Sequence, residues 1–385
     1  MNQKQLYKIW MVALLSIIFL GLICVFRIFT EGHSAVFHTD DQVPWTLLIA
    51  AYIFFVLTST GVTFVSSLSL VFKKDKYYPI AKRCVFIAIA ALIAGFIAMG
   101  LELGKPFNMI YYIFDPNPIS PIWWMGVLYF FYLVLLLLKF WRIHNGDWNS
   151  KFSKIIGLAT IICAVAAHST LGSVFGLIEA RPTFFGEYMP VYFLLTAFLS
   201  GLATITVINL MYYKVTNRNI PEIEKPAFES IAKIFAFVIS IAIIFSIWRT
   251  ITGLFANRPE YEVMEYIVNS IPFRTEVLIG LVIPLTLMLI TKIRHSSYGK
   301  IIAGFLVLFG LGIGRMDLVM TGQMLPIMPK NTIEHSAILY FPTIWEWIVG
   351  FFAMAVMLFI YTLGEKYLKL DAAPNHSFSV ELKTD

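Results

Sequence analysis

Charged residues are scarce in this chain. Only 14% of its 385 residues are Asp, Glu, Lys or Arg, whereas 59% are hydrophobic and the mean hydropathy is +0.78. A soluble globular domain carries about 25% charged residues. The composition therefore excludes an ordinary soluble enzyme and indicates a protein that crosses a membrane several times. The net charge of +6 needs no nucleic-acid partner, because basic loops on the cytoplasmic side of a membrane explain it.

Cysteine and histidine are scarce too. Cys24, Cys84 and Cys163 are isolated in apolar segments, without the spacing of an iron–sulfur cluster, a zinc site or a covalent haem. Only His168 of the seven histidines falls within an apolar span, and a b-type haem between helices needs two axial ligands. The other six fall in predicted loops or the tail: His33, His38, His144, His295, His335 and His376. We expect neither haem nor iron–sulfur cluster in this chain.

Long apolar runs are abundant instead. A helix needs about 20 predominantly apolar residues to cross the hydrocarbon core of a bilayer. The chain contains ten such runs: Lys8–Ile28, Pro44–Phe72, Lys82–Leu103, Pro121–Trp141, Lys154–Ile178, Pro190–Tyr213, Ala232–Phe255, Thr275–Ile293, Lys300–Gly322 and Phe341–Leu363. They predict an all-α polytopic membrane protein with about ten transmembrane helices.

Loop charges predict the orientation of these spans. Basic residues follow the second, fourth, sixth and eighth spans, in the groups Lys73, Lys74 and Lys76, then Arg142 and Lys151, then Lys214 and Arg218, then Lys292 and Arg294. The other loops are poorer in Lys and Arg. By the positive-inside rule both termini are predicted to be cytoplasmic, in a multi-pass protein of the cytoplasmic (inner) membrane.

We single out six ionisable side chains inside the spans: Glu102, His168, Arg249, Arg315, Asp317 and Glu346. A charge near the membrane centre costs about 2.5–3.5 kcal/mol on the insertion scale, so such residues are functional-site candidates. Counting the helix rise from the basic ends places all six in the half nearer the outer side. Structural alternatives remain open: Glu102 emerging into the interface, Arg249 reaching the headgroups, and Arg315 pairing with Glu346.

A set of motifs distributed over the chain resembles one known family. The motifs are Tyr77-Tyr78-Pro79-Ile80-Ala81-Lys82-Arg83, Gly100-Leu101-Glu102-Leu103-Gly104-Lys105-Pro106, His168-Ser169-Thr170-Leu171-Gly172-Ser173, Tyr188-Met189-Pro190, Phe193-Leu194-Leu195-Thr196-Ala197-Phe198, and Tyr340-Phe341-Pro342-Thr343 with Glu346. Together they resemble the NrfD/polysulfide-reductase integral membrane subunit family. The resemblance covers roughly Pro44 to Leu363 and is strongest to ten-span members, found in membrane-bound uptake hydrogenases and sulfite-reduction-associated quinone complexes.

The resemblance implies a function. Such subunits carry no cofactor, bind a quinone near the periplasmic face and dock a ferredoxin-like iron–sulfur subunit there. The chain would then exchange electrons between membrane (mena)quinone and that subunit, which passes them to or from a catalytic subunit in anaerobic respiration. Quinone reduction consumes two protons, so a titratable group is needed beside each carbonyl.

The resemblance also implies site residues. His168, Glu102 and Ser169 are the candidates for quinone binding and proton exchange. Arg249, Glu276, Arg315, Asp317 and Glu346 would form a second polar patch or a proton path. Two segments depart from the family pattern. Pro44-Trp45-Thr46-Leu47 lacks the polar quinone-contacting group of some members, and the loop Met324-Leu325-Pro326-Ile327-Met328-Pro329-Lys330 is a candidate docking element.

The residues at which several spans begin are similar in the two halves of the chain. They predict one integral membrane domain with a four-helix bundle at 44–178, a second at 190–322, flanking helices at 1–29 and 341–368, and a cytoplasmic tail at 369–385. Parallel repeats with buried charges also suit a secondary transporter, although the charges crowd one side and mid-span Gly or Pro interruptions are few. The third alternative is a purely structural membrane anchor for an extrinsic redox enzyme.

Overall fold

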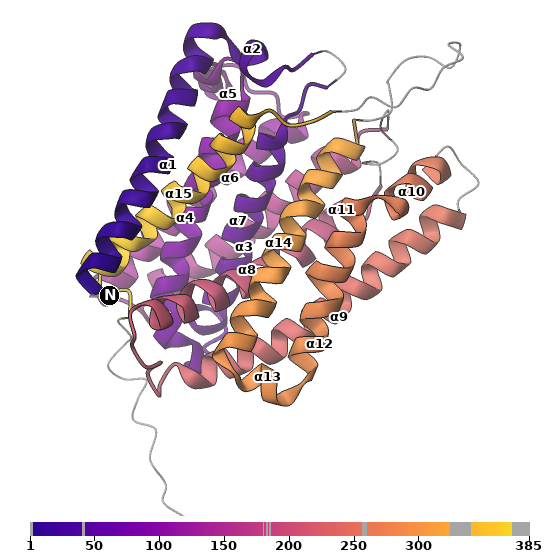
Figure 1. The fold of residues 1–385 in the computed structure, drawn as a ribbon. Coiled ribbons are helices and arrows are strands. Elements are labelled where there is room, and N and C mark those ends of the chain that lie inside the picture. The colour runs from indigo at the N-terminus through magenta and orange to yellow at the C-terminus, as the bar shows by residue number, and fades with distance from the viewer. Residues whose placement is uncertain are drawn as a thin grey trace, which may run out of the picture.

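The fold is a bundle of long helices (Figure 1). The computed structural model describes residues 3–40, 43–179, 181, 184, 186–255, 260–323 and 340–371. Within these ranges 83% of the residues are helical and no strand occurs. Ten helical segments of the described chain are long and apolar enough to cross a membrane. The prediction of an all-α polytopic membrane protein with about ten spans is confirmed.

Nine of the spanning segments are each built on one long helix. They are α1 (Gln3–Glu31), α3 (Leu47–Leu70), α4 (Tyr78–Glu102), α6 (Pro121–His144), α7 (Lys151–Gly176), α8 (Met189–Val215), α9 (Lys225–Phe255), α14 (Ser297–Thr321) and α15 (Ile344–Tyr367). The remaining span joins α11 (Ile271–Arg274), the π-helix η3 (Thr275–Val282) and α12 (Ile283–Leu289). Short elements connect them: α2 (His33–Phe37), η1 (Asp75–Tyr77), η2 (Pro106–Ile110), α5 (Tyr111–Phe114), α10 (Glu260–Asn269) and α13 (Thr291–His295).

Polar side chains define where several of these helices begin. Ser120 caps α6 and is followed by Pro121, whose missing N–H costs nothing in the first turn. Ser150 caps α7 by accepting a hydrogen bond from the Ser153 N–H at 3.1 Å. Each cap satisfies one of the N–H groups that have no partner inside the helix.

The helix α3 lies at the centre of the bundle. It packs against α4, α7, α8, α14 and α15, and nearly all of its residues are buried. Gly61 of α3 and Gly201 of α8 bring the two backbones into direct contact, because a Cβ on Gly61 would overlap the Ala197 carbonyl. Small residues at membrane helix interfaces permit such close approach. The two helices that open the predicted four-helix bundles are therefore packed on each other; the division into two bundles stays a prediction.

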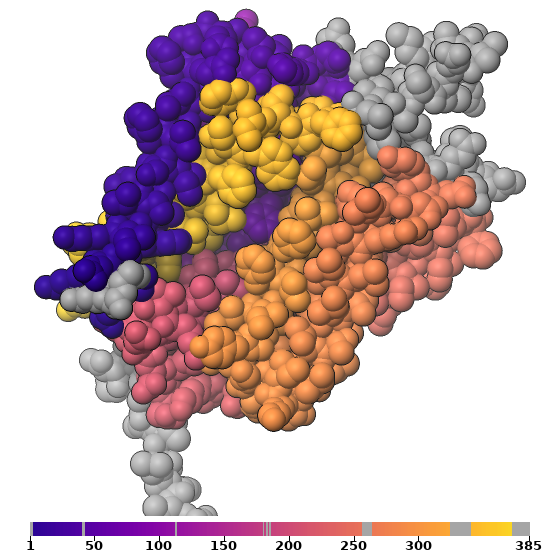
Figure 2. Space-filling model, viewed as in Figure 1, coloured from indigo at the N-terminus to yellow at the C-terminus, as the bar shows by residue number. Residues whose placement is uncertain are grey.

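The ends of the bundle can be named from these elements. We call the end where α1 ends, α2 lies and α3 and α15 begin the α2 face, and the opposite end the α13 face (Figure 1). At one edge of the molecule α1 and α15 lie side by side, next to the surface formed by α14 (Figure 2). The Trp10 indole N–H donates to the Thr362 hydroxyl at 3.1 Å and fastens α1 to α15. Most of α1 remains exposed, as expected for a lipid-facing helix.

The eighth span differs from its predicted bounds. It begins at Ile271 and ends at Leu289, instead of running from Thr275 to Ile293. Ile290 adopts an extended backbone, and α13 starts as a separate short helix. Pro284 cannot donate the hydrogen bond that a regular α-helix requires, and the π-helical stretch immediately precedes it.

The seventh span starts earlier than its hydropathy indicates. The helix α9 begins at Lys225, seven residues before the predicted Ala232 (232 − 225), because the Glu224 carbonyl accepts the backbone N–H groups of Ala227 and Phe228. The loop from Met324 to Lys330, predicted as a docking element, lies outside the described residues.

Buried ion pairs join four helices near the α13 face. The guanidinium of Arg83, only 1% exposed, lies 2.5 Å from the Glu365 carboxylate and 3.5 Å from that of Glu224. The Tyr213 hydroxyl donates to Glu224 at 2.8 Å, and the Tyr361 hydroxyl donates to Glu365 at 2.8 Å. Breaking a buried pair by removing one partner costs about 3–5 kcal/mol, because the remaining charge stays buried. This cluster fixes the starts of α4 and α9 to the ends of α8 and α15.

Candidate functional site

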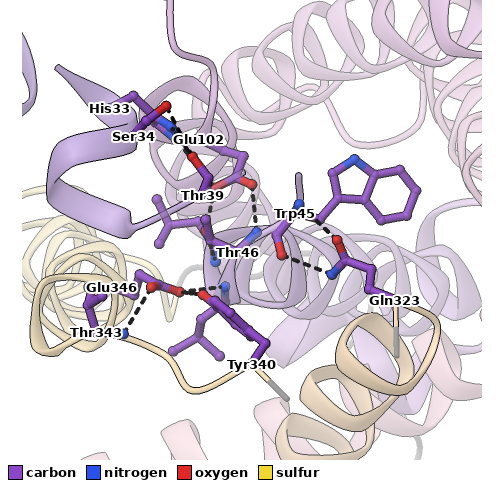
Figure 3. Close-up of polar contacts among 12 residues, drawn as sticks. His33, Ser34, Thr39, Trp45, Thr46, Glu102, Gln323, Tyr340, Thr343 and Glu346 are labelled. Atoms are coloured by element: carbon purple, nitrogen blue, oxygen red, sulfur yellow. Dashed lines mark hydrogen bonds and ion pairs between the residues drawn. The ribbon is translucent and has the colours of Figure 1, made fainter. Parts of the chain in front are cut away.

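Several polar side chains contact the start of α3 at the α2 face (Figure 3). The Glu102 carboxylate, at the end of α4, accepts hydrogen bonds from the Thr46 backbone N–H at 2.8 Å and from the Thr46 hydroxyl. The Thr46 hydroxyl oxygen accepts in turn from the Leu48 N–H at 3.1 Å and caps α3. Negative charge is favourable beside a helix N-terminus. The start of α3 therefore compensates the charge of this mostly buried carboxylate.

A second carboxylate binds the same helix start. Glu346, in the first turn of α15, accepts the backbone N–H groups of Leu47 and Thr343, each at 2.9 Å, and the Tyr340 hydroxyl (Figure 3). With Thr343 it forms a capping box that begins α15. Burial and the neighbouring Glu346 raise the pKa of Tyr340, which keeps its hydroxyl protonated as a donor. Glu346 thus joins α15 to α3, and the predicted pairing of Arg315 with Glu346 does not occur.

The segment before α3 is held by a side-chain amide. Gln323 Oε1 accepts the Trp45 backbone N–H at 2.9 Å, and Gln323 Nε2 donates to the Trp45 carbonyl at 2.9 Å (Figure 3). The Trp45 ring packs against Phe175 and Phe184, with ring centroids 5.4 and 5.6 Å apart. The stretch whose sequence departs from the family pattern is therefore the meeting point of α3, α4, α7, α14 and α15.

His33 faces Glu102 from the short helix α2. Its Nε2 lies 3.9 Å from Glu102 Oε2 and has no hydrogen-bond partner in the described part of the chain. Gly32, with a φ of +94°, allows the backbone to turn from α1 into α2 and bring this ring over Glu102. Sequence reasoning assigned His33 to a loop and missed it; the Glu31-Gly32-His33 turn after the first span was the available signal.

His168 belongs to a different network, deeper in the bundle. The side chain is fully buried, and its Nδ1 lies 2.8 Å from the Thr60 hydroxyl. The Tyr129 hydroxyl lies 3.3 Å from Nδ1 and 3.4 Å from Nε2. Ser169, the next residue, is half-buried, and its carbonyl accepts the Ser173 hydroxyl at 2.9 Å. No hydrogen bond in the described residues joins the Ser169 hydroxyl to His168 or Glu102.

The structure does not bring Glu102 and His168 together. Both are hydrogen-bonded to α3, Glu102 through Thr46 and His168 through Thr60. These threonines are 14 positions apart (60 − 46), which corresponds to about 21 Å of helix rise. That separation is far longer than one quinone ring, so the two side chains are not placed to hold opposite carbonyls of the same molecule.

Further hydroxyl groups line α3 from the level of His168 toward the α13 face, and sequence reasoning missed them. The Tyr132 hydroxyl lies 3.1 Å from the Ser59 hydroxyl and 2.6 Å from that of Thr63. Further along, Lys139 of α6 is only 3% exposed and donates from Nζ to the Ser66 hydroxyl at 3.0 Å. Lys139 is thus a further buried ionisable residue inside a span, beyond those named from the sequence. The available signal was the recurrence of Ser and Thr from position 58 to 69 of an otherwise apolar run.

Arginines mark the second polar patch, between α8, α9, η3 and α14. Arg315 is 2% exposed, donates to the Thr196 hydroxyl, and lies 5.0 Å from the ring centroid of Tyr192. Arg249 lies 5.8 Å from the same ring, on the α9 side. Cation–π contacts of this kind strengthen when they are desolvated. Arg249 Nε and Arg315 Nη1 have no hydrogen-bond partner in the described residues.

Glu276 completes this patch. The Tyr192 hydroxyl donates to Glu276 Oε1 at 3.1 Å. The carboxylate occupies a notch on α14 that exists only because residue 314 is glycine, since a Cβ there would overlap it. A cavity of about 20 Å³ is lined by Tyr192, Thr196, Ser246, Arg249 and Glu276 together with apolar side chains, which is enough for one water molecule.

Asp317 lies near the patch, and Glu346 does not. Asp317 is mostly buried on α14 and within electrostatic reach of Glu276 and Arg249. No direct ion pair joins the two acidic and two basic side chains in the described residues. The structure therefore gathers Arg249, Glu276, Arg315 and Asp317, and separates Glu346 from them.

The fold and these buried ionisable groups define an integral membrane protein with polar sites enclosed between its helices. The chain belongs to the family described as polysulphide reductase, NrfD, whose model matches residues 35–327. It is therefore a multi-pass membrane subunit of the NrfD family, as the sequence motifs indicated.

Three relatives align over most of the chain. A selenate reductase subunit of Mesobacillus selenatarsenatis is 24% identical over 93% of this chain and 94% of its own length. The Hdr-like menaquinol oxidoreductase integral membrane subunit of Archaeoglobus fulgidus is 23% identical over 83% and 84%. A putative dimethyl sulfoxide reductase membrane subunit of Halobacterium salinarum is 21% identical over 88% and 86%. Each is named as a subunit of a reductase or an oxidoreductase.

Proposed function

We propose that this chain is the quinone-reactive membrane subunit of a multi-subunit respiratory oxidoreductase. It exchanges electrons between a membrane quinone of the menaquinone type and an iron–sulfur subunit docked on the α2 face, which is linked to a catalytic subunit. Family membership and the three named relatives, one of them a menaquinol oxidoreductase subunit, support the class. The orientation inferred from loop charges makes the α2 face periplasmic.

One observation carries the assignment of the reacting site. Glu102 and His33 place a carboxylate and an imidazole 3.9 Å apart at the α2 face, and one ring nitrogen of His33 has no hydrogen-bond partner in the described residues. Quinone chemistry needs groups that take up and release protons, and imidazole and carboxylate side chains are groups of this kind. We assign proton exchange with the quinone to this pair, close to an external iron–sulfur cluster.

His168 has a separate role in this proposal. Its network with Thr60 and Tyr129 lies about 20 Å along α3 from the Glu102 contact. We assign His168 to proton exchange within the bundle, at a distance from the quinone ring held at the α2 face. Arg249, Glu276, Arg315 and Asp317 form a second polar site, for which we propose proton transfer through the water-sized cavity.

Substitution of Glu102 tests the proposal. Glu102→Gln keeps the shape of the side chain but removes its proton-accepting charge, so oxidation of a soluble naphthoquinol by the assembled complex should fall by at least 10²-fold, as is typical for loss of a general base. Glu346→Gln is the matched control, since it also alters a carboxylate bound to the start of α3 but has no histidine partner in the described residues. It should lower the melting temperature and leave quinol oxidation within a few-fold.

A second candidate function has its own support. Both carboxylates satisfy backbone N–H groups at the start of α3, which is what a purely structural anchor would need. If Glu102→Gln and Glu346→Gln reduce stability equally and neither changes quinol oxidation in the intact complex, the anchor function is correct. Co-purification of iron–sulfur and catalytic subunits with the chain is expected under both functions, and its absence would contradict both.

A further inference from the structure

The connection between α4 and α6 presents an unusual apolar surface. It contains η2 and α5 and lies at the α2 face (Figure 1). Phe107 is 81% exposed, Phe114 73% and Ile119 92%, and none of the residues of η2 is buried. Further exposed apolar side chains lie between them: Met109, Ile110 and Tyr111. In a loop that faced water, so many exposed large apolar groups would be costly, and such patches mark interaction surfaces.

Contacts at both ends of this connection indicate its depth relative to the membrane interface. The Phe107 ring lies 6.1 Å from that of Phe29, which is exposed near the end of α1. At the other end, the Trp124 indole N–H donates to the Pro118 carbonyl at 2.8 Å, and Trp124 lies in the first turn of α6. Aromatic residues at the ends of spans favour the level of the lipid headgroups. The connection is therefore tied at both ends to side chains at the membrane interface.

The patch continues the lipid-facing surface of the spans. Phe29 and Phe26 extend it along α1, and Trp124 extends it along α6, all with exposed side chains. Only Lys105 and Asp115 carry charge between Gly104 and Ser120. Non-obligate protein interfaces are about as polar as the rest of a protein surface, whereas this segment presents mainly apolar groups. Continuity with the lipid-facing helices favours lipid as the occupant.

We propose that residues 106–119 form a monotopic anchor that lies in the lipid leaflet adjoining the α2 face. Phe107, Phe114 and Ile119 enter the boundary between headgroups and acyl chains, and the exposed Lys105 reaches the phosphates. Because this segment directly follows Glu102, the anchor holds the end of α4 at the membrane surface. The proposal concerns lipid contact and does not depend on quinone reactivity.

Spin-label accessibility tests the anchor. Phe107→Cys and Ile119→Cys are labelled in the complete complex, reconstituted in phospholipid nanodiscs, and collision rates with oxygen and with a water-soluble nickel chelate are measured. Leu15→Cys on the exposed face of α1 is the lipid control, and Asn149→Cys in the exposed connection between α6 and α7 is the aqueous control. Unsubstituted protein gives the background of the native cysteines, two of which are buried.

The expected result is an oxygen-to-nickel ratio at positions 107 and 119 that is several-fold above that at position 149 and approaches that at position 15. A ratio equal to that at position 149 would overturn the proposal, because the segment would then face water. Low accessibility to both reagents in the complex, with high nickel accessibility after the partner subunits are removed, would also overturn it and assign the surface to a protein partner. Both substitutions are at strongly exposed positions, so folding should be retained, as unchanged quinol oxidation would verify.

Discussion

Gly314 offers a direct test of how Glu276 is held. A Cβ at this position would overlap the Glu276 carboxylate, whereas a Cβ at Gly312, on the same helix, would meet nothing within 4 Å. Gly→Ala in a helix is worth about 1 kcal/mol of intrinsic propensity at either position. The difference between Gly314→Ala and Gly312→Ala therefore isolates the displacement of the carboxylate.

The size of that difference follows from the contact that is lost. A displaced Glu276 forfeits the 3.1 Å hydrogen bond from Tyr192, and hydrogen bonds to charged groups contribute about 1.5–3 kcal/mol. We expect Gly312→Ala to stabilise the chain by up to about 1 kcal/mol. Gly314→Ala should destabilise it by about 0.5–2 kcal/mol, once the gain in propensity is subtracted from the lost bond.

A double-mutant cycle gives the decisive measurement. In a Glu276→Ala background the overlap is absent, so Gly314→Ala should become neutral or stabilising, with a coupling energy of about 2 kcal/mol. Free energies of unfolding are measured in mixed micelles as a function of the mole fraction of denaturing detergent, with Gly312→Ala in both backgrounds as the control. Equal effects of Gly314→Ala in the two backgrounds would refute the packing of Glu276 against this helix.

Two further substitutions test the packing at other levels of the bundle. Glu365→Gln removes the nearer partner of the buried Arg83 and should cost about 3 kcal/mol in unfolding free energy. Glu31→Gln breaks a solvent-exposed i,i+4 pair and should change the unfolding free energy far less; comparable losses would contradict the difference in burial. Gly61→Ala forces α3 away from the α8 backbone and should prevent a stable fold, so the monodisperse peak in size-exclusion chromatography should be lost. Gly100→Ala, whose Cβ would meet nothing within 4 Å, should leave that peak unchanged.

The spans were predictable because length and hydropathy decide them. Each apolar run of about 20 residues has one low-energy structure in lipid, a helix that satisfies its own backbone groups. Two spans differ from these expectations. The seventh starts earlier than its hydropathy indicates, and in the eighth the π-helix before Pro284 and the extended Ile290 depend on local backbone geometry that hydropathy does not report. The ionisable residues could also be found from the sequence, since each one interrupts an apolar run.

The partners of those residues were not predictable. Glu102 contacts Thr46, which is 56 positions earlier, and Glu346 contacts Leu47, which is 299 positions earlier. Such pairings depend on which helix ends meet at the α2 face, and no local pattern in the sequence encodes that. His33 was missed for the same reason, since its significance comes from the turn at Gly32 that brings it over Glu102.

The position of α3 between the two histidine-containing networks has a measurable consequence. Glu102 and His168 reach α3 through threonines about 21 Å apart along its axis. Effects of substitutions at sites more than about 10 Å apart, without shared partners, usually add to within about 0.5 kcal/mol. The changes in unfolding free energy caused by Glu102→Gln and by His168→Ala should therefore add in the double variant. A single quinone held between the two side chains would instead couple the two changes. A coupling energy well above about 0.5 kcal/mol, measured in mixed micelles with quinone present and absent, would contradict two separate sites. If the coupling appears only with quinone, the bound quinone links Glu102 and His168 energetically, which would contradict independent roles for the two residues.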